Sequence, residues 1–246
     1  MLKKRIIPSL LILDGELVKG EQFNSWRRVG NPVQAMRVHE MRGVDEVVLL
    51  DIGATPNKTR PNFDLIREIS DNALMPLSVG GGVRTLDDIQ ELLRAGADKV
   101  VIGTAGIAGT GLFEEAVKKF GGSTIVAAID VKDGRVYSHC GRFPTLLYPL
   151  NVAVQVADIG VGEILLTAID RDGMLTGYDL NLIARVAALL SIPVIAAGGG
   201  RDARDFALAF DCGAHAVAAG AAFQFTGLTP LMAAQELDKR GYEVRV

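Results

Sequence analysis

The sequence is poor in the residues that typify secreted or metal-dependent proteins. Its 246 residues include 2 cysteines, 3 histidines and 1 tryptophan. Cys140 and Cys212 lie far apart and have no CxxC spacing, so neither a disulfide framework nor a zinc site is indicated. The histidines are scattered, and no metal or other cofactor is predicted. We expect two reduced thiols in a cytoplasmic protein.

Long apolar runs and clusters of positive charge are also missing. The apolar run in the N-terminal segment MLKKRIIPSLLIL is too short for a signal peptide or a membrane span, and no transmembrane candidate follows it. The formal net charge is -3 and the pI is near 5.7, which argues against binding to nucleic acid because phosphate backbones are met by clustered Lys and Arg. Hydrophobic residues make up 49%, enough for a large core.

Short β-branched runs alternate with amphipathic helical patterns along the whole chain. Regular alternation predicts a parallel sheet, and eight such units close a (βα)8 TIM barrel. No linker interrupts the pattern, so we expect one barrel domain over residues 1–246. The expected strands are 5–12, 46–52, 76–80, 99–103, 124–130, 163–169, 193–197 and 216–220, and helical patterns include 32–42, 85–94, 111–120 and 180–190.

An internal repeat relates the two halves of the chain. Three matches share one register, because 160 − 43, 193 − 76 and 212 − 95 all equal 117. We therefore predict that two duplicated (βα)4 halves build the barrel. The matches are GVDEVVLLDI with GVGEILLTAI, PLSVGGGVR with PVIAAGGGR, and AGADKVVIGTA with CGAHAVAAGAA.

Small residues follow equivalent strands in both halves. Glycines allow backbone N–H groups to approach phosphate oxygens closely, and phosphates commonly bind at this end of such barrels. Tight turns alone would explain either cluster, but their symmetric repetition favours two phosphate sites and hence a phosphorylated ligand with a phosphate at each end. The residues predicted to bind phosphate are Gly81, Gly82, Gly103 and Thr104 in one half, and Gly173, Gly198, Gly199, Gly220 and Ala221 in the other.

Carboxylates lie at the ends of several expected strands. Asp130 ends its strand inside a hydrophobic run, where a carboxylate is costly unless it has a task or a partner. It is the best candidate for a general acid or base, the alternative being a residue that braces a loop or caps a helix. Asp51 and Asp172 are expected at the same mouth. Leu11 stands at the position of the other half that matches Asp130.

Four charged residues are placed at the opposite end of the barrel. Arg5, Glu46, Lys99 and Glu163 each stand at or near the start of a strand, two of either sign. Such a ring commonly stabilises this face, or it could gate a passage along the axis. Sequence pattern alone leaves both readings open.

The motifs KRIIPSL, LLDIGAT, SVGGGVRTLDD, LLRAGADKV, VAAID, GEILLTAIDRDGMLTGYD and SIPVIAAGGG together resemble the cyclase subunit of imidazole glycerol phosphate synthase, over nearly the entire chain. The resemblance implies a barrel that receives ammonia from a glutaminase docked on its bottom face. It also implies that the four charged residues form the ammonia gate, that Asp98 faces the glutaminase, and that Thr167 joins Asp130 and Asp172 in the site.

The sequence departs from the family pattern at several site positions. The first of two catalytic carboxylates falls on Leu11, and Gly103, Ala197 and Ala221 replace polar residues. Losing one general acid or base typically lowers a rate by about 10²–10⁴-fold. The segments PSLLILDGELVK and VGNPVQAMRVHE resemble instead a paralogous branch of glycosyl amidation-associated proteins.

These departures lead us to expect an ammonia-channelling synthase subunit that works with a glutaminase, in sugar amidation for surface polysaccharide. One alternative is a working cyclase of histidine biosynthesis in which Asp14 or Asp51 replaces the missing carboxylate. Another is a noncatalytic scaffold that binds a phosphorylated ligand and activates a glutaminase.

Overall fold

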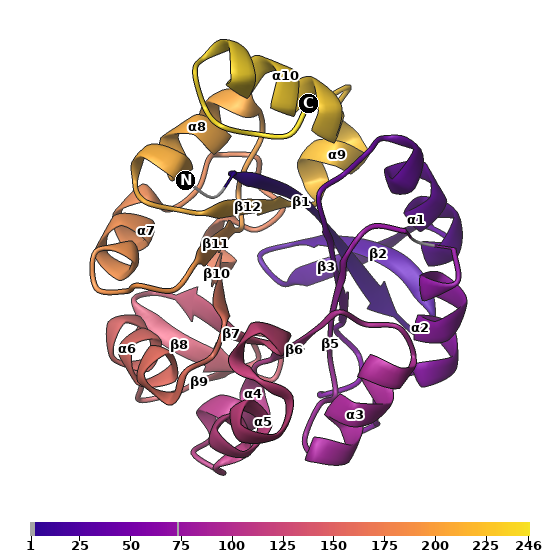
Figure 1. Ribbon diagram of the computed structural model, residues 1–246, viewed down its shortest axis with the longest axis vertical. Coiled ribbons are helices and arrows are strands. Elements are labelled where there is room, and N and C mark those ends of the chain that lie inside the picture. The colour runs from indigo at the N-terminus through magenta and orange to yellow at the C-terminus, as the bar shows by residue number, and fades with distance from the viewer. Residues whose placement is uncertain (1–2, 73) are drawn as a thin grey trace.

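Eight parallel strands close into a barrel in the computed structural model, which describes residues 3–72 and 74–246. Strand β1 pairs with both β12 and β4, and the pairing of β7 with β10 completes the circle. Helices surround the strands (Figure 1). This confirms the predicted (βα)8 barrel. The barrel strands are β1 (Arg5–Leu13), β4 (Val47–Asp51), β5 (Leu77–Gly80), β6 (Lys99–Ile102), β7 (Ile125–Lys132), β10 (Glu163–Ala168), β11 (Val194–Ala197) and β12 (Ala216–Ala219).

Six of the helices described below begin at a residue whose side chain caps the helix: α1, α2, α3, α7, α8 and α10. Thr85 forms a capping box with Asp88, and at the equivalent position of the second half Asp202 accepts hydrogen bonds from the N–H groups of Arg204 and Asp205. None of the helices described is long and apolar enough to cross a membrane. The α-helices are α1 (Pro32–Met41), α2 (Phe63–Ser70), α3 (Leu86–Arg94), α4 (Thr104–Ile107), α5 (Leu112–Phe120), α6 (Pro149–Ile159), α7 (Leu180–Ala187), α8 (Ala203–Asp211), α9 (Ala221–Phe225) and α10 (Pro230–Lys239).

The barrel interior is filled by one cluster of aliphatic side chains. Branched residues from different strands meet there and exclude water from the axis, as is usual in this fold. A second, larger layer of apolar residues lies between the strands and the helices, so each strand is buried on both sides. The interior cluster consists of Ile7, Val48, Val101, Val126, Leu165, Ile195, Ala216 and Ala218.

Two antiparallel additions extend the barrel at its mouth. Strands β2 (Glu16–Glu21) and β3 (Asn24–Gly30) form a hairpin after β1, and β8 (Arg135–Ser138) and β9 (Phe143–Pro144) follow β7. The alternation of strand and helix did not predict them. Asp-Gly dipeptides at the turns were a usable signal, because Asp14 and Gly15 have φ of 53° and 78° and Asp133 and Gly134 have 49° and 71°.

We expect Thr85→Ala to lower the free energy of unfolding by about 1 kcal/mol, because the substitution removes the side-chain oxygen that accepts the Asp88 N–H. Denaturant unfolding measures the change. Thr176→Ala is the matched control, since Thr176 is exposed and its hydroxyl has no hydrogen-bond partner within the described ranges. Equal stability of the two variants would contradict this role of the cap.

Candidate functional site

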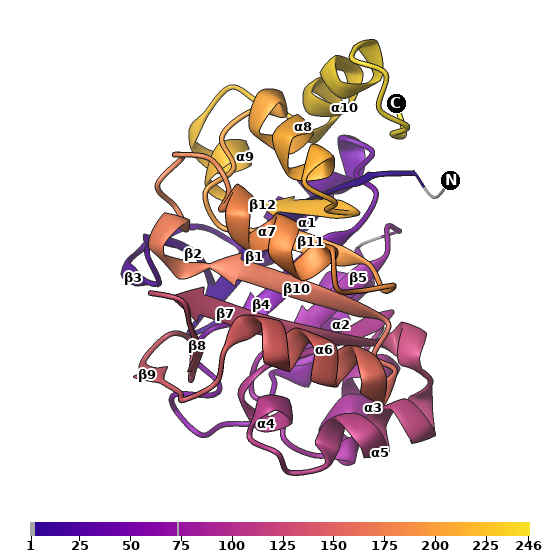
Figure 2. The same ribbon diagram turned by 90° about the vertical axis from the view of Figure 1, so that its left-hand side faces the viewer.

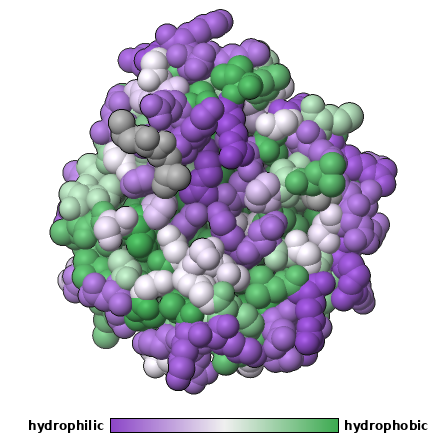
Figure 3. All heavy atoms as spheres, in the orientation of Figure 1, coloured by the Kyte–Doolittle hydropathy of each residue, from purple (hydrophilic) through white to green (hydrophobic). Residues whose placement is uncertain are grey.

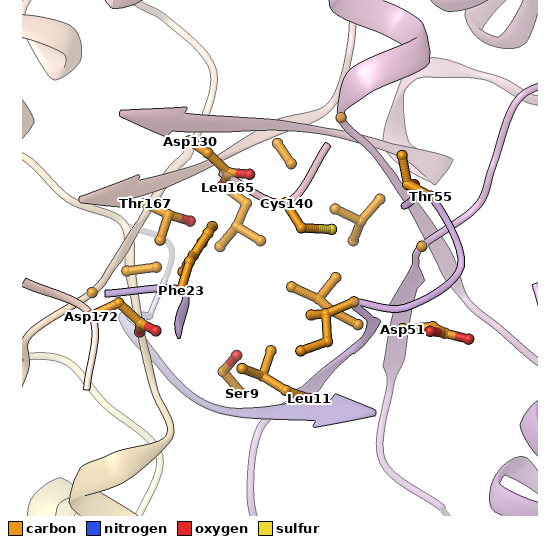
Figure 4. A pocket seen from close by; sticks show the side chains of 18 of the residues that line it. Ser9, Leu11, Phe23, Asp51, Thr55, Asp130, Cys140, Leu165, Thr167 and Asp172 are labelled. Atoms are coloured by element: carbon orange, nitrogen blue, oxygen red, sulfur yellow. The ribbon is translucent and has the colours of Figure 1, made fainter. Parts of the chain in front are cut away.

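A chamber of about 410 Å³ occupies the mouth of the barrel, where the carboxyl ends of the strands meet. Glycine-rich turns from both halves line it, and the side chains of Asp130, Thr167 and Asp172 lie along one wall (Figure 4). The structure thus brings the predicted catalytic and phosphate-binding residues of the two halves into one cavity. The predicted ring of charges lies at the other end of the barrel.

Asp130 lies near the end of β7, directly beside Thr167 of β10 in the strand register. Burial raises the pKa of Asp130 to about 7, and the negative charge of Asp172 acts in the same direction, whereas a hydrogen bond from Thr167 opposes them. A carboxyl group with a pKa near 7 can both donate and accept a proton at neutral pH. This geometry agrees with the predicted role of Asp130 as a general acid or base, which stays a prediction.

Asp172 follows a short 3-10 turn, η2 (Ile169–Arg171), after β10. Burial raises its pKa, and the charge of Lys19 and the N–H of Gly173 offset part of that rise. Its Oδ2 atom is buried and has no hydrogen-bond partner among the described residues. A buried carboxylate oxygen without a partner is costly, so this oxygen is available to a ligand.

Asp51 ends β4 and borders the chamber, but its carboxylate is engaged elsewhere. Its Oδ1 accepts the N–H groups of Gly53 and Ala54 at 2.9 and 3.0 Å, and the side chain points away from the middle of the chamber in Figure 4. Burial raises its pKa, and these two hydrogen bonds oppose that rise. The geometry fits a residue that braces the loop after β4 better than one that transfers protons.

Leu11 lies on β1 and lines the chamber on the side opposite β7, next to Leu50 of β4 in register. It is only 6% exposed. The wall opposite Asp130 is therefore apolar. An acidic residue at this position would have to be buried, so the strand end here is less solvated than its place at a barrel mouth suggests.

The glycines of the two halves make the same close contacts at positions that differ by 117. A Cβ on Gly81 would collide with the carbonyl oxygen of Asp51, and one on Gly198 would collide with that of Ala168. Gly82 and Gly199, with φ of 73° and 105°, follow them in the left-handed region. Both turns therefore require glycine, and both bring backbone to the chamber wall.

Short helices begin beside these glycine turns. Gly103 precedes α4 and Gly220 precedes α9, and all four turns border the same chamber. The Thr104 hydroxyl already accepts the N–H of His139 at 2.8 Å. Gly173 also borders the chamber, and a Cβ there would collide with the Gly20 carbonyl of the β2–β3 hairpin. These positions agree with the predicted phosphate cradles, which remain a prediction.

Several chamber residues were not predicted from the sequence. Lys19 and Phe23 come from the β2–β3 hairpin. At the tip of this hairpin the backbone N–H of Gln22 donates to the carbonyl oxygen of Asp172 at 2.8 Å. Burial lowers the pKa of Lys19, and the charge of Asp172 opposes this. Cys140, on the loop before β9, points into the chamber, and burial raises its pKa to about 12. Recognising the hairpin turns would have placed Lys19 and Phe23 near the mouth.

The four charged residues at the bottom form a closed ring of ion pairs. Arg5 contacts Glu46 at 2.6 Å and Glu163 at 2.8 Å, and Lys99 contacts the same two carboxylates at 3.1 and 2.9 Å. Strands β1 and β10 are not neighbours, so the Arg5–Glu163 pair spans the bore. Burial raises the pKa of Glu163, but hydrogen bonds and charges from Arg5 and Lys99 outweigh this and hold it below its usual value.

Asp98 and His215 occupy equivalent positions on the bottom face, since 215 − 98 is 117. Asp98 Oδ2 accepts the N–H of Leu77 at 2.8 Å, and His215 Nδ1 accepts that of Val194 at 3.4 Å. Each side chain thereby holds the start of the preceding strand. Asp98 has a structural role in addition to the partner contact that the resemblance implies. Within 3–72 and 74–246 no cluster of three His, Cys, Asp or Glu could hold a metal ion.

Known proteins match the chain over nearly its full length. It is 42% identical over 241 residues to imidazole glycerol phosphate synthase subunit HisF of Myxococcus xanthus, covering 96% of this chain and 95% of that protein. It is 41% identical to the protein of the same name from Dehalococcoides mccartyi, covering 100% and 99%, and 42% identical to that from Frankia casuarinae, covering 90% of each.

These relatives correct one expectation. The function predicted first, in sugar amidation for surface polysaccharide, is wrong, because proteins similar over 90% or more of the chain are named as subunits of imidazole glycerol phosphate synthase. The replacements at Leu11, Gly103, Ala197 and Ala221 do not outweigh the similarity of the whole chain to these relatives. The alternative reading, histidine biosynthesis, is the one that the relatives support.

The family comparison agrees with the relatives. The profile of the family described as "Histidine biosynthesis protein" matches residues 5–229, which include all eight barrel strands and the whole chamber. Identities of 41–42% over nearly complete chains are consistent with that match. The chain therefore belongs to the histidine biosynthesis protein family, as a HisF-type (βα)8 barrel.

Proposed function

We propose that this chain is the cyclase subunit of an imidazole glycerol phosphate synthase, an enzyme subunit that uses ammonia to close an imidazole ring. The observation that carries the proposal is the single chamber in which two symmetric glycine cradles flank Asp130. A ligand with a phosphate at each end would span the cradles and place its middle beside this carboxyl. The near full-length similarity to HisF subunits supports the same reading.

Asp130 is the first proton-transfer group in this proposal. Its raised pKa of about 7 matches the requirement that the group be protonated in one step and free in another. Thr167 lies directly beside Asp130 in the strand register and borders the same chamber. Asp172, whose Oδ2 has no partner in the described part of the chain, is the second carboxylate in the chamber.

Leu11 stands where the family has its other catalytic carboxylate. Asp172 is a better candidate to replace that carboxylate than Asp51 or Asp14. Asp51 is held by two backbone N–H groups, and Asp14 is exposed in the tight turn before β2 and does not border the chamber. Asp172 is on the same side of the chamber as Asp130, so both proton transfers occur along one wall. The opposite wall, formed around Leu11 and Leu50, contacts the ligand without exchanging protons.

The bottom face is the proposed entry for ammonia. The ion-pair ring closes the bore, so its four residues must part for a molecule to enter from below. A glutaminase docked on this face would release ammonia directly below the ring. The word "subunit" in the names of the relatives agrees with a partner.

The direct test is an assay with the histidine-pathway ribonucleotide and ammonium, in which the chain should form imidazole glycerol phosphate. No turnover, either with ammonium or with glutamine and a glutaminase subunit, would overturn the proposal. A scaffold that binds ligand without converting it would show binding and no product.

We expect Asp130→Asn to lower turnover by about 10²–10⁴-fold, because Asn cannot transfer the proton. The wild-type rate should change with an ionisation near pH 7 that the variant lacks. Since the folded-state pKa is raised above its unfolded value, Asp130 loses its contribution to stability as pH rises through about 7. Asp130→Asn should therefore unfold at a higher temperature than wild type above pH 7. A slow variant that is also less stable there would indicate damage to the fold instead.

A sugar derivative with phosphates at both ends should bind about 10²-fold more tightly than the same compound with one phosphate removed, because the second phosphate binds within the same molecule. Gly103→Ala should weaken the binding of the compound with two phosphates. The nearest atom to the added Cβ would be Ala128 Cβ at 3.6 Å, an ordinary contact, so the protein without ligand accommodates the substitution. Gly103 and Ala128 both border the chamber. Calorimetry measures both effects. Gly227→Ala, in open space outside the chamber, is the control, and equal binding of the two compounds would contradict two phosphate sites.

We expect Asp98→Lys to weaken binding of a glutaminase subunit by about tenfold or more, because a charge in the interface is reversed. Asp98→Asn separates this effect from the fold, since its amide oxygen can still accept the Leu77 N–H. The Asn variant should be as stable as wild type and show a smaller loss of binding. Interferometry with the immobilised glutaminase would measure both, and wild-type affinity of the Lys variant would place the interface elsewhere.

A further inference from the structure

The path along the barrel axis from the bottom face to the chamber is apolar. Figure 2 shows both chain termini at one end of the barrel and the hairpins β2–β3 and β8–β9 at the other. Figure 3 looks on to the end with the termini, where hydrophilic residues gather over the central part. Between the ion-pair ring and the chamber lies the aliphatic cluster around Ile7 and Val126, whose side chains form no hydrogen bonds. A neutral molecule such as ammonia crosses this region at a much lower cost than an ammonium ion, because a charge would be desolvated without a partner.

The chamber floor above this cluster is almost entirely apolar as well. Successive side chains of a strand point to opposite faces, so the residue two positions after a cluster residue faces the floor. Only Ser9 and Thr167 at this level have a side chain that can form a hydrogen bond. The residues at this level, all of which border the chamber, are Ser9, Leu50, Gly103, Ala128, Thr167, Ala197 and Gly220.

Ser9 and Thr167 lie on different sides of the chamber. Thr167 belongs to the wall with the carboxylates, since it lies beside Asp130 in the strand register. Ser9 is on β1, which is opposite β7 in the circle of strands. In Figure 4 its hydroxyl points into the chamber next to Leu11. Among residues 3–72 and 74–246 this hydroxyl has no hydrogen-bond partner. Ser9 is thus a free polar group on the apolar side.

We propose that the Ser9 hydroxyl positions ammonia on the chamber floor, an inference that rests on the proposed function and adds a residue to it. The hydroxyl oxygen can accept one N–H of ammonia, which leaves the lone pair of the nitrogen free to react. The neighbouring side chains of Leu11 and Leu50 offer no competing partner. Ammonia that has crossed the apolar interior therefore finds its hydrogen bond on the side of the chamber that faces Asp130.

Steady-state kinetics with the histidine-pathway ribonucleotide and ammonium test the proposal. Ser9→Ala should raise the KM for ammonium by about 3–10-fold, the effect of one lost neutral hydrogen bond, and leave the KM for the ribonucleotide unchanged. Ser9→Cys is similar in size but its sulfur accepts only weakly, so it should behave like the alanine variant. Ser9→Thr keeps the hydroxyl and should stay close to wild type.

Ser123→Ala is the matched control, because Ser123 is exposed in the 3-10 turn η1 (Gly122–Thr124) and does not border the chamber. An assay with glutamine and a glutaminase subunit gives a second readout. Ser9→Ala should form less product per glutamate than wild type, because ammonia that is not held in the chamber escapes. Circular dichroism checks that each variant is folded. If the alanine variant folds poorly, the comparison of Ser9→Thr with Ser9→Cys decides.

The results separate this inference from the proposed function. An active wild type whose KM for ammonium is unchanged in Ser9→Ala would overturn the role of Ser9 and leave the proposed function standing, as would equal KM values in the Thr and Cys variants. A rise in the KM for the ribonucleotide alone would assign Ser9 to ligand binding and also overturn the inference. A wild type that forms no product from ammonium or glutamine would overturn the proposed function, and the inference with it.

Discussion

The closure of eight parallel strands is the constraint on which the rest of the structure depends. Because β1 pairs in parallel with β12 on one side and β4 on the other, the carboxyl ends of all eight strands lie at one face of the barrel. The mouth thus collects Asp130, Thr167 and the glycine turns, which are far apart in the sequence. The opposite face collects the strand starts, and with them the ring around Arg5.

Much of this could be predicted from the sequence, for physical reasons. Short β-branched runs alternating with helical patterns identified all eight barrel strands, and the repeat at 117 residues placed the glycine clusters at equivalent turns. The hairpins after β1 and β7 were missed because they interrupt the alternation on which the prediction relied. As a consequence Lys19 and Phe23, which the first hairpin brings over the mouth, were absent from the predicted site.

Side-chain direction was the other element that sequence could not supply. Asp51 and Asp130 both lie at or near the carboxyl end of a strand, and the sequence does not distinguish them. In the structure Asp51 accepts two backbone N–H groups, whereas Asp130 has a pKa near 7 beside Thr167. Leu11 shows the opposite limit of sequence reasoning, since a single replaced carboxylate says less about the family than the similarity along the whole chain. Leu11 and Leu50 form an apolar wall of the chamber that faces the wall with Asp130 and Asp172. The replacement thus changes the polarity of one wall and leaves the fold unchanged.

The pairing of Asp98 with His215 has a consequence for how the bottom face can be read. Both side chains hold a backbone N–H of the preceding strand, so the duplicated halves have kept the same framework. One position is a carboxylate and the other an imidazole, and the electrostatic potential therefore lacks the pseudo-symmetry of the backbone. To a molecule that recognises only shape, the face offers two equivalent ways to bind; to one that recognises charge, it offers a single orientation.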